Sequence, residues 1–182
     1  MQSTGTSNVE VVQLDLANIE NIQKFAEDIK ERISEIDCLV CNAGVWYPMD
    51  LQAKTDDGFE ANVGVNHLGH FLLVNLLLDD MSRAKGARVC IVGSITGNSN
   101  TVGGGLVYPR AELGDLEGFA EGGVKPVAMV DGKPFFGAKA YKDSKICNMM
   151  TILYCILMEG MDRQYIDKVQ KRDCLDNMTT QQ

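Results

Sequence analysis

The chain has 182 residues, of which 45% are hydrophobic and 23% are charged, and its formal net charge is -8 at pH 7. This length suits one domain with a sizeable core. The acidic balance disfavours nucleic-acid binding. No apolar stretch reaches the roughly 20 residues of a membrane span, and the N-terminus lacks the apolar segment of a signal peptide.

Short apolar runs alternate with amphipathic segments along the first half of the chain. Three such runs predict strands, at residues 9–14, 36–41 and 88–92. Apolar residues at helical spacing predict two helices between them, at residues 18–33 with Asn18 as N-cap and at residues 57–81. This order predicts an α/β fold in which a parallel sheet carries helices on both faces. Such sheets bind ligands at the carboxyl ends of their strands.

Residues 97–137 interrupt this pattern, because they hold ten of the 18 glycines and three of the four prolines without any helical or strand period. Long irregular segments of this kind are usually functional or mobile. A further helix is expected to begin near Ala138. We expect residues 1–151 to form the domain, with 97–137 as a glycine-rich insertion, and residues 152–182 to form a divergent helical or disordered tail.

Two pairs of residues suggest metal or redox chemistry, and a structural role is preferred for each. Cys38 and Cys41 form C-x-x-C within an apolar strand, where their side chains point to opposite faces. They are interpreted as small buried residues in a reducing compartment. His67 and His70 are neighbours on a helix, but no further ligands lie at zinc-site spacing, so no metal is expected.

Tyr141 and Lys145 carry the strongest chemical signal in the chain. Four residues apart in a predicted helix, they share one face. An ammonium near a phenol favours the phenolate, and a tyrosine in this setting can transfer a proton near neutral pH. A solvated helix face would explain the pair equally well if it stood alone.

Three upstream features lie where this fold places its ligands. The turn formed by Asn42, Ala43 and Gly44 directly follows the second predicted strand, and Ser94 directly follows the third. The simpler interpretations are that residues 42–44 form an ordinary turn and that Ser94 only caps the backbone after its strand.

The third feature is Asn66, which lies inside a predicted helix, where asparagine is unfavourable. Gly69 weakens the same turn. A kink that presents a functional amide or holds a water would explain both residues.

In order along the chain, these features resemble the short-chain dehydrogenase/reductase family, a group of Rossmann-like enzymes. The resemblance implies that the adenosine side of the cofactor is held by Asp15, Asn42, Ala43 and Gly44. It also implies a catalytic tetrad whose members have separate tasks. Tyr141 is the expected proton donor, and Lys145 is expected to bind the nicotinamide ribose. Ser94 is expected to orient the substrate, and Asn66 to hold a water that relays protons.

Longer segments resemble one branch of that family, the light-dependent protochlorophyllide oxidoreductases. They include residues 39–43, 66–72, 76–80, 91–98, 113–116 and 137–145, and the glycine-rich insertion also matches. The resemblance implies light-driven reduction of the C17–C18 double bond of protochlorophyllide, with NADPH as hydride donor. It further implies a plastid or a cyanobacterial cytoplasm, and leaves open peripheral thylakoid association and a homo-oligomer.

The chain departs from the family pattern at both ends. It lacks the glycine-rich phosphate loop, so we expect a partial, doubly wound Rossmann-like sheet without the first βαβ unit and without the last strands. Residues 103–105 do not replace that loop, since no strand directly precedes them. Two alternatives remain open: another NADP-dependent short-chain reductase, and a non-enzymatic fragment that binds pigment or protein.

Overall fold

The structure is a computed structural model that describes residues 9–47, 53–98, 100–120 and 129–158. Its first helix, α1 (Ile19–Arg32), begins as predicted. The side chain of Asn18 accepts a hydrogen bond from the Asn21 amide. Glu20 in the first turn and basic residues in the last turn complement the helix dipole.

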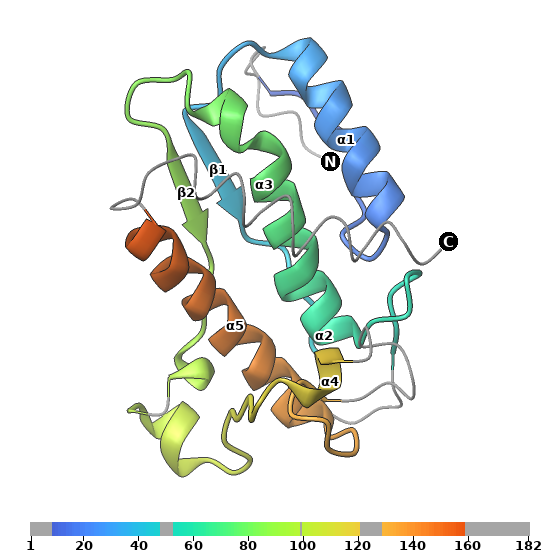
Figure 1. Cartoon of the computed structure of the whole chain (residues 1–182), viewed down its shortest axis with the longest axis vertical. Coiled ribbons are helices and arrows are strands. Elements are labelled where there is room, and N and C mark those ends of the chain that lie inside the picture. Colours follow the sequence, from blue (N-terminus) through green and yellow to red (C-terminus); the bar gives the residue numbers. More distant parts are fainter. Residues whose placement is uncertain (1–8, 48–52, 99, 121–128, 159–182) are drawn as a thin grey trace.

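Two parallel strands form the sheet, β1 (Cys38–Cys41) and β2 (Arg88–Ile91), and they confirm two of the three predicted strands. In register, Cys38 lies opposite Arg88 and Cys41 opposite Ile91. The ladder continues past the strand ends, because the Val92 amide donates to the Cys41 carbonyl. Figure 1 shows α3 between these strands and α1.

The prediction of a strand at residues 9–14 was wrong. This segment is assigned no strand, and most of its side chains are exposed. A strand needs a neighbour to pair its peptide groups. Within the described parts of the chain, the sheet contains β1 and β2 alone. Glu10 of the segment instead forms an ion pair with Arg32 of α1.

The predicted partial α/β fold with a parallel sheet is confirmed, but the expectation that these strands are buried with helices on both faces was wrong. Side chains of one sheet face, Cys38, Val40, Arg88 and Cys90, are exposed, and Val40 is 58% exposed. Cys41, on the other face, is buried. Helix α3 packs against β1 and leaves the first face uncovered. Of the two cysteines interpreted as buried, only Cys41 is buried.

The predicted helix at residues 57–81 is one continuous helical rod that begins at residue 61. It consists of α2 (Ala61–Val63), the π-helical segment η1 (Gly64–Gly69) and α3 (His70–Met81). Glu60 caps it, because its carboxylate accepts from the amides of Asn62 and Val63. The irregularity expected at Asn66 and Gly69 is therefore a π-helical turn, a feature common at functional sites.

By length and composition alone, Ala61–Met81 could cross a membrane, which the sequence pattern had not suggested. However, 61% of its most apolar stretch is buried inside the protein. The rod also buries polar residues, including Asn62, Asn66 and Asp80. These features are those of a core helix in a globular domain.

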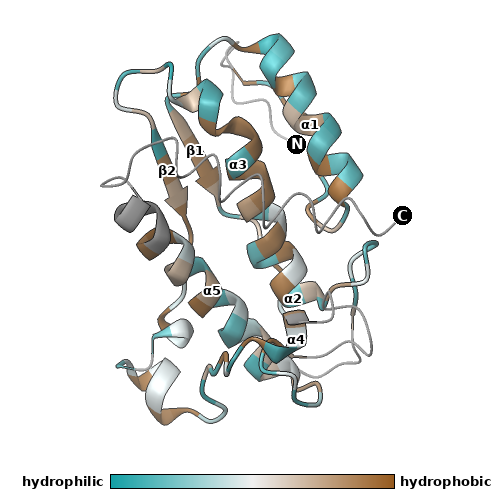
Figure 2. Cartoon of the chain, in the orientation of Figure 1, coloured by the Kyte–Doolittle hydropathy of each residue, from teal (hydrophilic) through white to brown (hydrophobic). Residues whose placement is uncertain are grey.

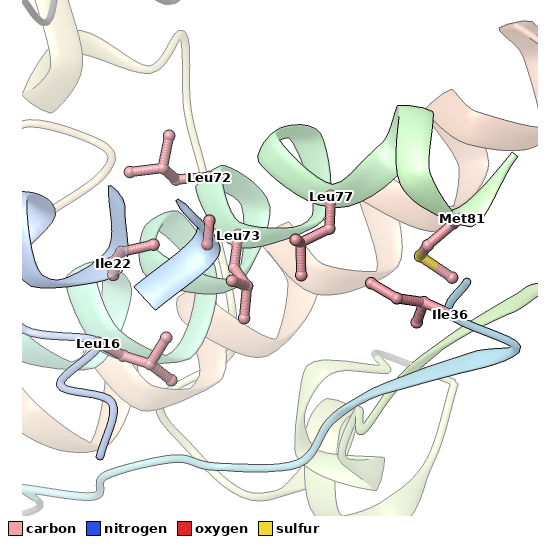
Figure 3. Packing of buried hydrophobic residues seen from close by; sticks show 8 residues of the cluster. Leu16, Ile22, Ile36, Leu72, Leu73, Leu77 and Met81 are labelled. Atoms are coloured by element: carbon pink, nitrogen blue, oxygen red, sulfur yellow. The ribbon is translucent and has the colours of Figure 1, made fainter. Parts of the chain in front are cut away.

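The main core lies between α1 and α3. Buried side chains of α1 meet α3 there, and Figure 3 shows Leu73 and Leu77 of α3 lining this interface. Figure 2 shows that α3 is apolar over most of its length, whereas α1 exposes hydrophilic residues. Full burial of a side chain such as Leu77 contributes about 1.5–3 kcal/mol to folding. The buried members are Leu16, Ile22, Ala26, Ile36, Leu72, Leu73, Leu77 and Met81.

The long helix predicted near Ala138 is α5 (Gly137–Met158). Between β2 and α5 the chain forms only short helical turns in the described parts, namely η2 (Ile95–Gly97), η3 (Val102–Leu106) and α4 (Glu117–Ala120). Residues 121–128 of the insertion and residues 159–182 of the expected tail lie outside the described residues. Helix α5 runs across the proposed boundary at residue 151, so that domain division stays a prediction.

Candidate active site

Tyr141 and Lys145 lie on one face of α5, at the carboxyl edge of the sheet. The Lys145 Nζ atom is 5.6 Å from the centre of the Tyr141 ring and donates to the Val92 carbonyl at 3.2 Å. Val92 directly follows β2. Burial lowers the pKa of the Lys145 ammonium. The helix thus presents a phenol and a cation together where a parallel sheet binds its ligands.

Asn66 is fully buried and joins three segments of the chain. Its Oδ1 accepts from the Val45 amide at 2.7 Å, and its Nδ2 donates to the Val45 carbonyl at 3.0 Å. The same Nδ2 donates to Ser144 Oγ at 3.0 Å, and Ser144 Oγ donates to the Tyr141 carbonyl at 2.7 Å. The asparagine therefore links the loop after β1 to the turn of α5 that carries Tyr141.

The predicted turn of Asn42, Ala43 and Gly44 follows β1, and all three residues are exposed at the same edge of the sheet. A Cβ atom on Gly44 would lie 3.1 Å from Asn66 Oδ1 and 3.8 Å from Lys145 Nζ. The first contact is tighter than most Cβ contacts in proteins, so a side chain at position 44 would press on Asn66, which favours a glycine there.

The structure thus brings the end of this turn together with Asn66 and Lys145. Asn42 and Ala43 lie between β1 and that contact, on the exposed side of the edge. Exposure leaves both residues accessible to a ligand. The part expected of Asn42, Ala43 and Gly44 in holding the adenosine side of the cofactor stays a prediction.

Sequence reasoning missed Trp46. Its ring lies 6.1 Å from the Tyr141 ring, at an interplanar angle of 51°, and the side chain is 63% exposed. An exposed indole beside the predicted proton donor provides an apolar surface for a ligand. No local pattern signalled this contact, because Trp46 lies in an irregular loop.

Ser94 does not contact Tyr141 in the described structure. Its Oγ instead lies 2.8 Å from Thr96 Oγ1 and accepts from the Thr96 amide, which makes Ser94 the N-cap of η2. The turn still packs on α5, because a Cβ on Gly97 would lie 3.0 Å from the Lys145 carbonyl carbon. The serine is near the site, but its hydroxyl is engaged locally.

Asp15 also makes local contacts. Its carboxylate accepts from the Ala17 amide, and its own amide donates to Asn21 at the start of α1. Among the described contacts, none joins Asp15 to residues 42–44. Its expected part in holding the adenosine stays a prediction.

The two histidines of the π-helical region have polar partners inside the protein. His67 Nδ1 lies 3.3 Å from Asn148 Oδ1, and burial lowers the pKa of His67 to about 4. His70 Nδ1 lies 3.1 Å from the Asn66 carbonyl, and burial followed by the charge of Lys145 lowers the pKa of His70. Since a carbonyl only accepts, His70 donates from Nδ1.

Comparison with known proteins identifies related sequences. The family model of the short chain dehydrogenases matches residues 1–111. The chloroplastic protochlorophyllide reductase of Daucus carota is 51% identical over 150 residues, which cover 80% of this chain and 37% of that protein. The reductase of Chlamydomonas reinhardtii is 52% identical over 145 residues, 78% of this chain and 36% of that protein. The chain thus spans little more than a third of these relatives.

Solved structures share the fold. An uncharacterised protein from Mycobacterium paratuberculosis superposes with a TM-score of 0.57 at 31% identity, over 84% of this chain and 46% of that one. The Pseudomonas aeruginosa RhlG/NADP active-site complex gives a TM-score of 0.53 at 21% identity, over 82% of this chain and 47% of that one. The second likeness concerns the fold alone.

Proposed function

Since the chain belongs to the short-chain dehydrogenase family, we propose that it carries the proton-donor part of a protochlorophyllide reductase site. The supporting observation is the 51% identity to the Daucus carota enzyme over 150 residues, 80% of this chain. The proposed reaction is light-driven reduction of protochlorophyllide. The chloroplastic relatives extend the proposal to a plastid location.

The residues have distinct tasks in this proposal. Tyr141 donates the proton, and Lys145 holds the nicotinamide ribose and stabilises negative charge on the phenol oxygen. Ser144 and Asn66 hold the backbone of that helical turn in place through their hydrogen bonds. Ser94 orients the substrate, which requires its hydroxyl to leave Thr96.

The residues at the carboxyl edge of the sheet suit a nicotinamide dinucleotide. Lys145 donates to one described acceptor, the Val92 carbonyl, so its ammonium retains donors for ribose hydroxyls. The exposed turn of Asn42, Ala43 and Gly44 allows close backbone contact with the cofactor. When bound, NADPH supplies the hydride, and the choice of NADPH over NADH is part of the proposal.

A chimeric enzyme tests the proposal. Residues 9–151 replace the matching segment of the Daucus carota reductase, and chlorophyllide formation is measured under light with NADPH. The control is the same chimera kept in darkness. We expect light-dependent product from the chimera.

A chimera that folds, binds NADPH and reduces other carbonyl compounds but not protochlorophyllide would instead identify a different short-chain reductase. A chimera that binds the pigment without NADPH turnover would favour a binding role.

A further inference from the structure

Helix α5 fastens the glycine-rich insertion through three side chains that bracket Tyr141. Lys142 and Asp143 lie three and four residues after Lys139 near the start of this helix, so each is a neighbour of Lys139 on the helix surface. All three are buried. None belongs to the expected tetrad, and each contacts residues of the insertion.

Lys142 holds the first part of the insertion. Its Nζ donates to the Gly103 carbonyl at 3.0 Å and to the Val107 carbonyl at 2.7 Å. The two bonds attach the turn η3 to Lys142, which directly follows Tyr141 on α5. A buried ammonium that bonds only neutral carbonyls in the described contacts is costly. This cost suggests that the position of the turn matters.

Lys139 and Asp143 hold the second part. Their side chains pair at 2.6 Å, Asp143 accepts from the Glu112 amide at 2.9 Å, and Lys139 donates to the Glu112 carbonyl at 2.7 Å. Lys139 also lies 3.0 Å from the buried carboxylate of Asp131. Segments on both sides of α4 are thereby attached to the start of α5.

The turn held by Lys142 presents apolar side chains to solvent. Leu106 is 76% exposed and Tyr108 is 85% exposed, and Val102 and Val107 are exposed as well. Exposed apolar residues that cluster in this way, four within seven positions, can mark a surface that binds a ligand or partner. On the same helix, Tyr141 contacts the exposed ring of Trp46.

We propose that Lys142 is a positioning residue that holds residues 102–108 as an apolar wall for the flat ring system of protochlorophyllide. This inference rests on the proposed function for the identity of the ligand. The fastening itself follows from the two hydrogen bonds of Lys142. The wall governs binding of the pigment, while proton transfer stays with Tyr141.

Hydrogen exchange of the 182-residue chain tests the fastening. The variant Lys142→Met keeps the length of the side chain and removes its donors, Lys142→Arg keeps donors, and Lys24→Met changes an exposed lysine of α1. We expect Lys142→Met to speed amide exchange over residues 102–107 on the order of tenfold, with residues 129–133 unchanged. Lys142→Arg restores at least part of the protection, and Lys24→Met matches the wild type.

Pigment binding by the chimeric enzyme tests the wall. Lys142→Met should weaken protochlorophyllide binding roughly tenfold, while the single-flash yield at saturating pigment stays close to that of the parent chimera. If Lys142→Met damaged the fold in general, both the pigment affinity and the single-flash yield would fall, and Lys142→Arg would restore neither. Unchanged pigment affinity in Lys142→Met refutes the wall.

The two proposals fail in different ways. If the parent chimera does not bind protochlorophyllide, the proposed function is refuted and the wall with it. The exchange measurement, which needs no pigment, still decides whether Lys142 fastens the turn. Equal exchange over residues 102–107 in Lys142→Met and the wild type overturns the fastening.

Discussion

Asn66 and Ser144 are 78 residues apart in the chain, and their side chains meet in a buried hydrogen bond of 3.0 Å. The bond connects the π-helical turn η1 to α5 beside Lys145. Through Val45 it also orders the loop that follows β1. The relationship explains why an asparagine, which is unfavourable inside a helix, lies in the middle of this apolar helix.

Replacing Ser144 tests this link, and the chain offers a matched control. The hydroxyls of Ser144 and Ser82 each donate to the carbonyl three residues earlier at 2.7 Å, but only Ser144 is buried and accepts from Asn66. We expect Ser144→Ala to lower the free energy of unfolding by about 1–3 kcal/mol, because the Asn66 amide loses a partner. Ser82→Ala should cost less than about 0.5 kcal/mol. Urea unfolding measures both, and equal costs would contradict the link.

Gly44 and Gly93 provide a second matched pair, since each lies within a few residues of the end of a strand. A Cβ on Gly44 would press on the Asn66 side chain, which Val45 holds in place, whereas a Cβ on Gly93 meets nothing within 4 Å. We expect Gly44→Ala to destabilise the protein by about 1–2 kcal/mol. Gly93→Ala should be neutral or stabilise it by up to about 1 kcal/mol. Thermal unfolding compares the two, and a stable Gly44→Ala variant would rule out the close approach.

Substitutions at Tyr141 and at Lys145 should have different effects on the chimeric reductase. Tyr141→Phe should lower the light-driven yield per flash about 100-fold or more and leave pigment binding nearly intact, because the proton is needed only as charge develops. Lys145→Met should weaken NADPH binding as well as the yield. The exposed Lys85→Met serves as control. A Tyr141→Phe variant with wild-type yield would exclude the phenol as the essential donor.

Asp143 should make the stability depend on pH between about 4 and 6. Burial raises the pKa of its carboxyl from 3.8 to about 6, against the opposing effects of Lys139 and the Glu112 amide. The charge of Asp131 acts in the same direction as burial. The folded protein therefore binds the proton more tightly than the unfolded chain. The resulting stabilisation is complete below about pH 4 and is lost as the pH rises through about 6.

Comparison with Asp143→Asn isolates this effect. The free energy of unfolding of the wild type, relative to the variant, should fall by about 1–3 kcal/mol from about pH 4 to about pH 7. Urea unfolding across this range provides the measurement. A constant difference would mean that the carboxyl titrates at its ordinary value.

His67 should have the opposite effect on stability to Asp143, because it should make the protein less stable as the pH falls. Burial lowers its pKa from 6.5 to about 4, although the bond to Asn148 favours the charged form. Its stabilising contribution is present above about pH 6.5 and is lost as the pH falls toward about 4. The wild type should lose about 1–3 kcal/mol relative to His67→Gln over this interval. NMR titration of the imidazole provides an independent check, and a midpoint near the ordinary value of about 6.5 would contradict the prediction.

Local patterns in the sequence were sufficient to predict several helices and the placement of two site residues. The Asn18 cap predicted the start of α1, the apolar periods predicted α1 and α3, and the Tyr141–Lys145 spacing placed both side chains on one face of α5. Each of these depends on residues within a few positions of one another, where helix geometry alone decides which side chains are neighbours.

Burial of the strands could not be judged in this way. The apolar runs at residues 36–41 and 88–92 predicted strands correctly, but a run does not reveal whether another layer covers each sheet face. The segment 9–14 has the composition of a strand and is assigned none, since strand formation depends on a partner elsewhere in the chain.

The sequence alone thus determined the family, the helices α1, α3 and α5, and the Tyr141–Lys145 pair. Only the tertiary structure decided that Asn66 bonds Ser144, that Trp46 lies beside Tyr141, and that Lys142 holds the Gly103 and Val107 carbonyls. These contacts join residues 35 to 95 positions apart. No local period encodes such pairs, because they depend on how the helices pack and on which buried polar groups then need partners.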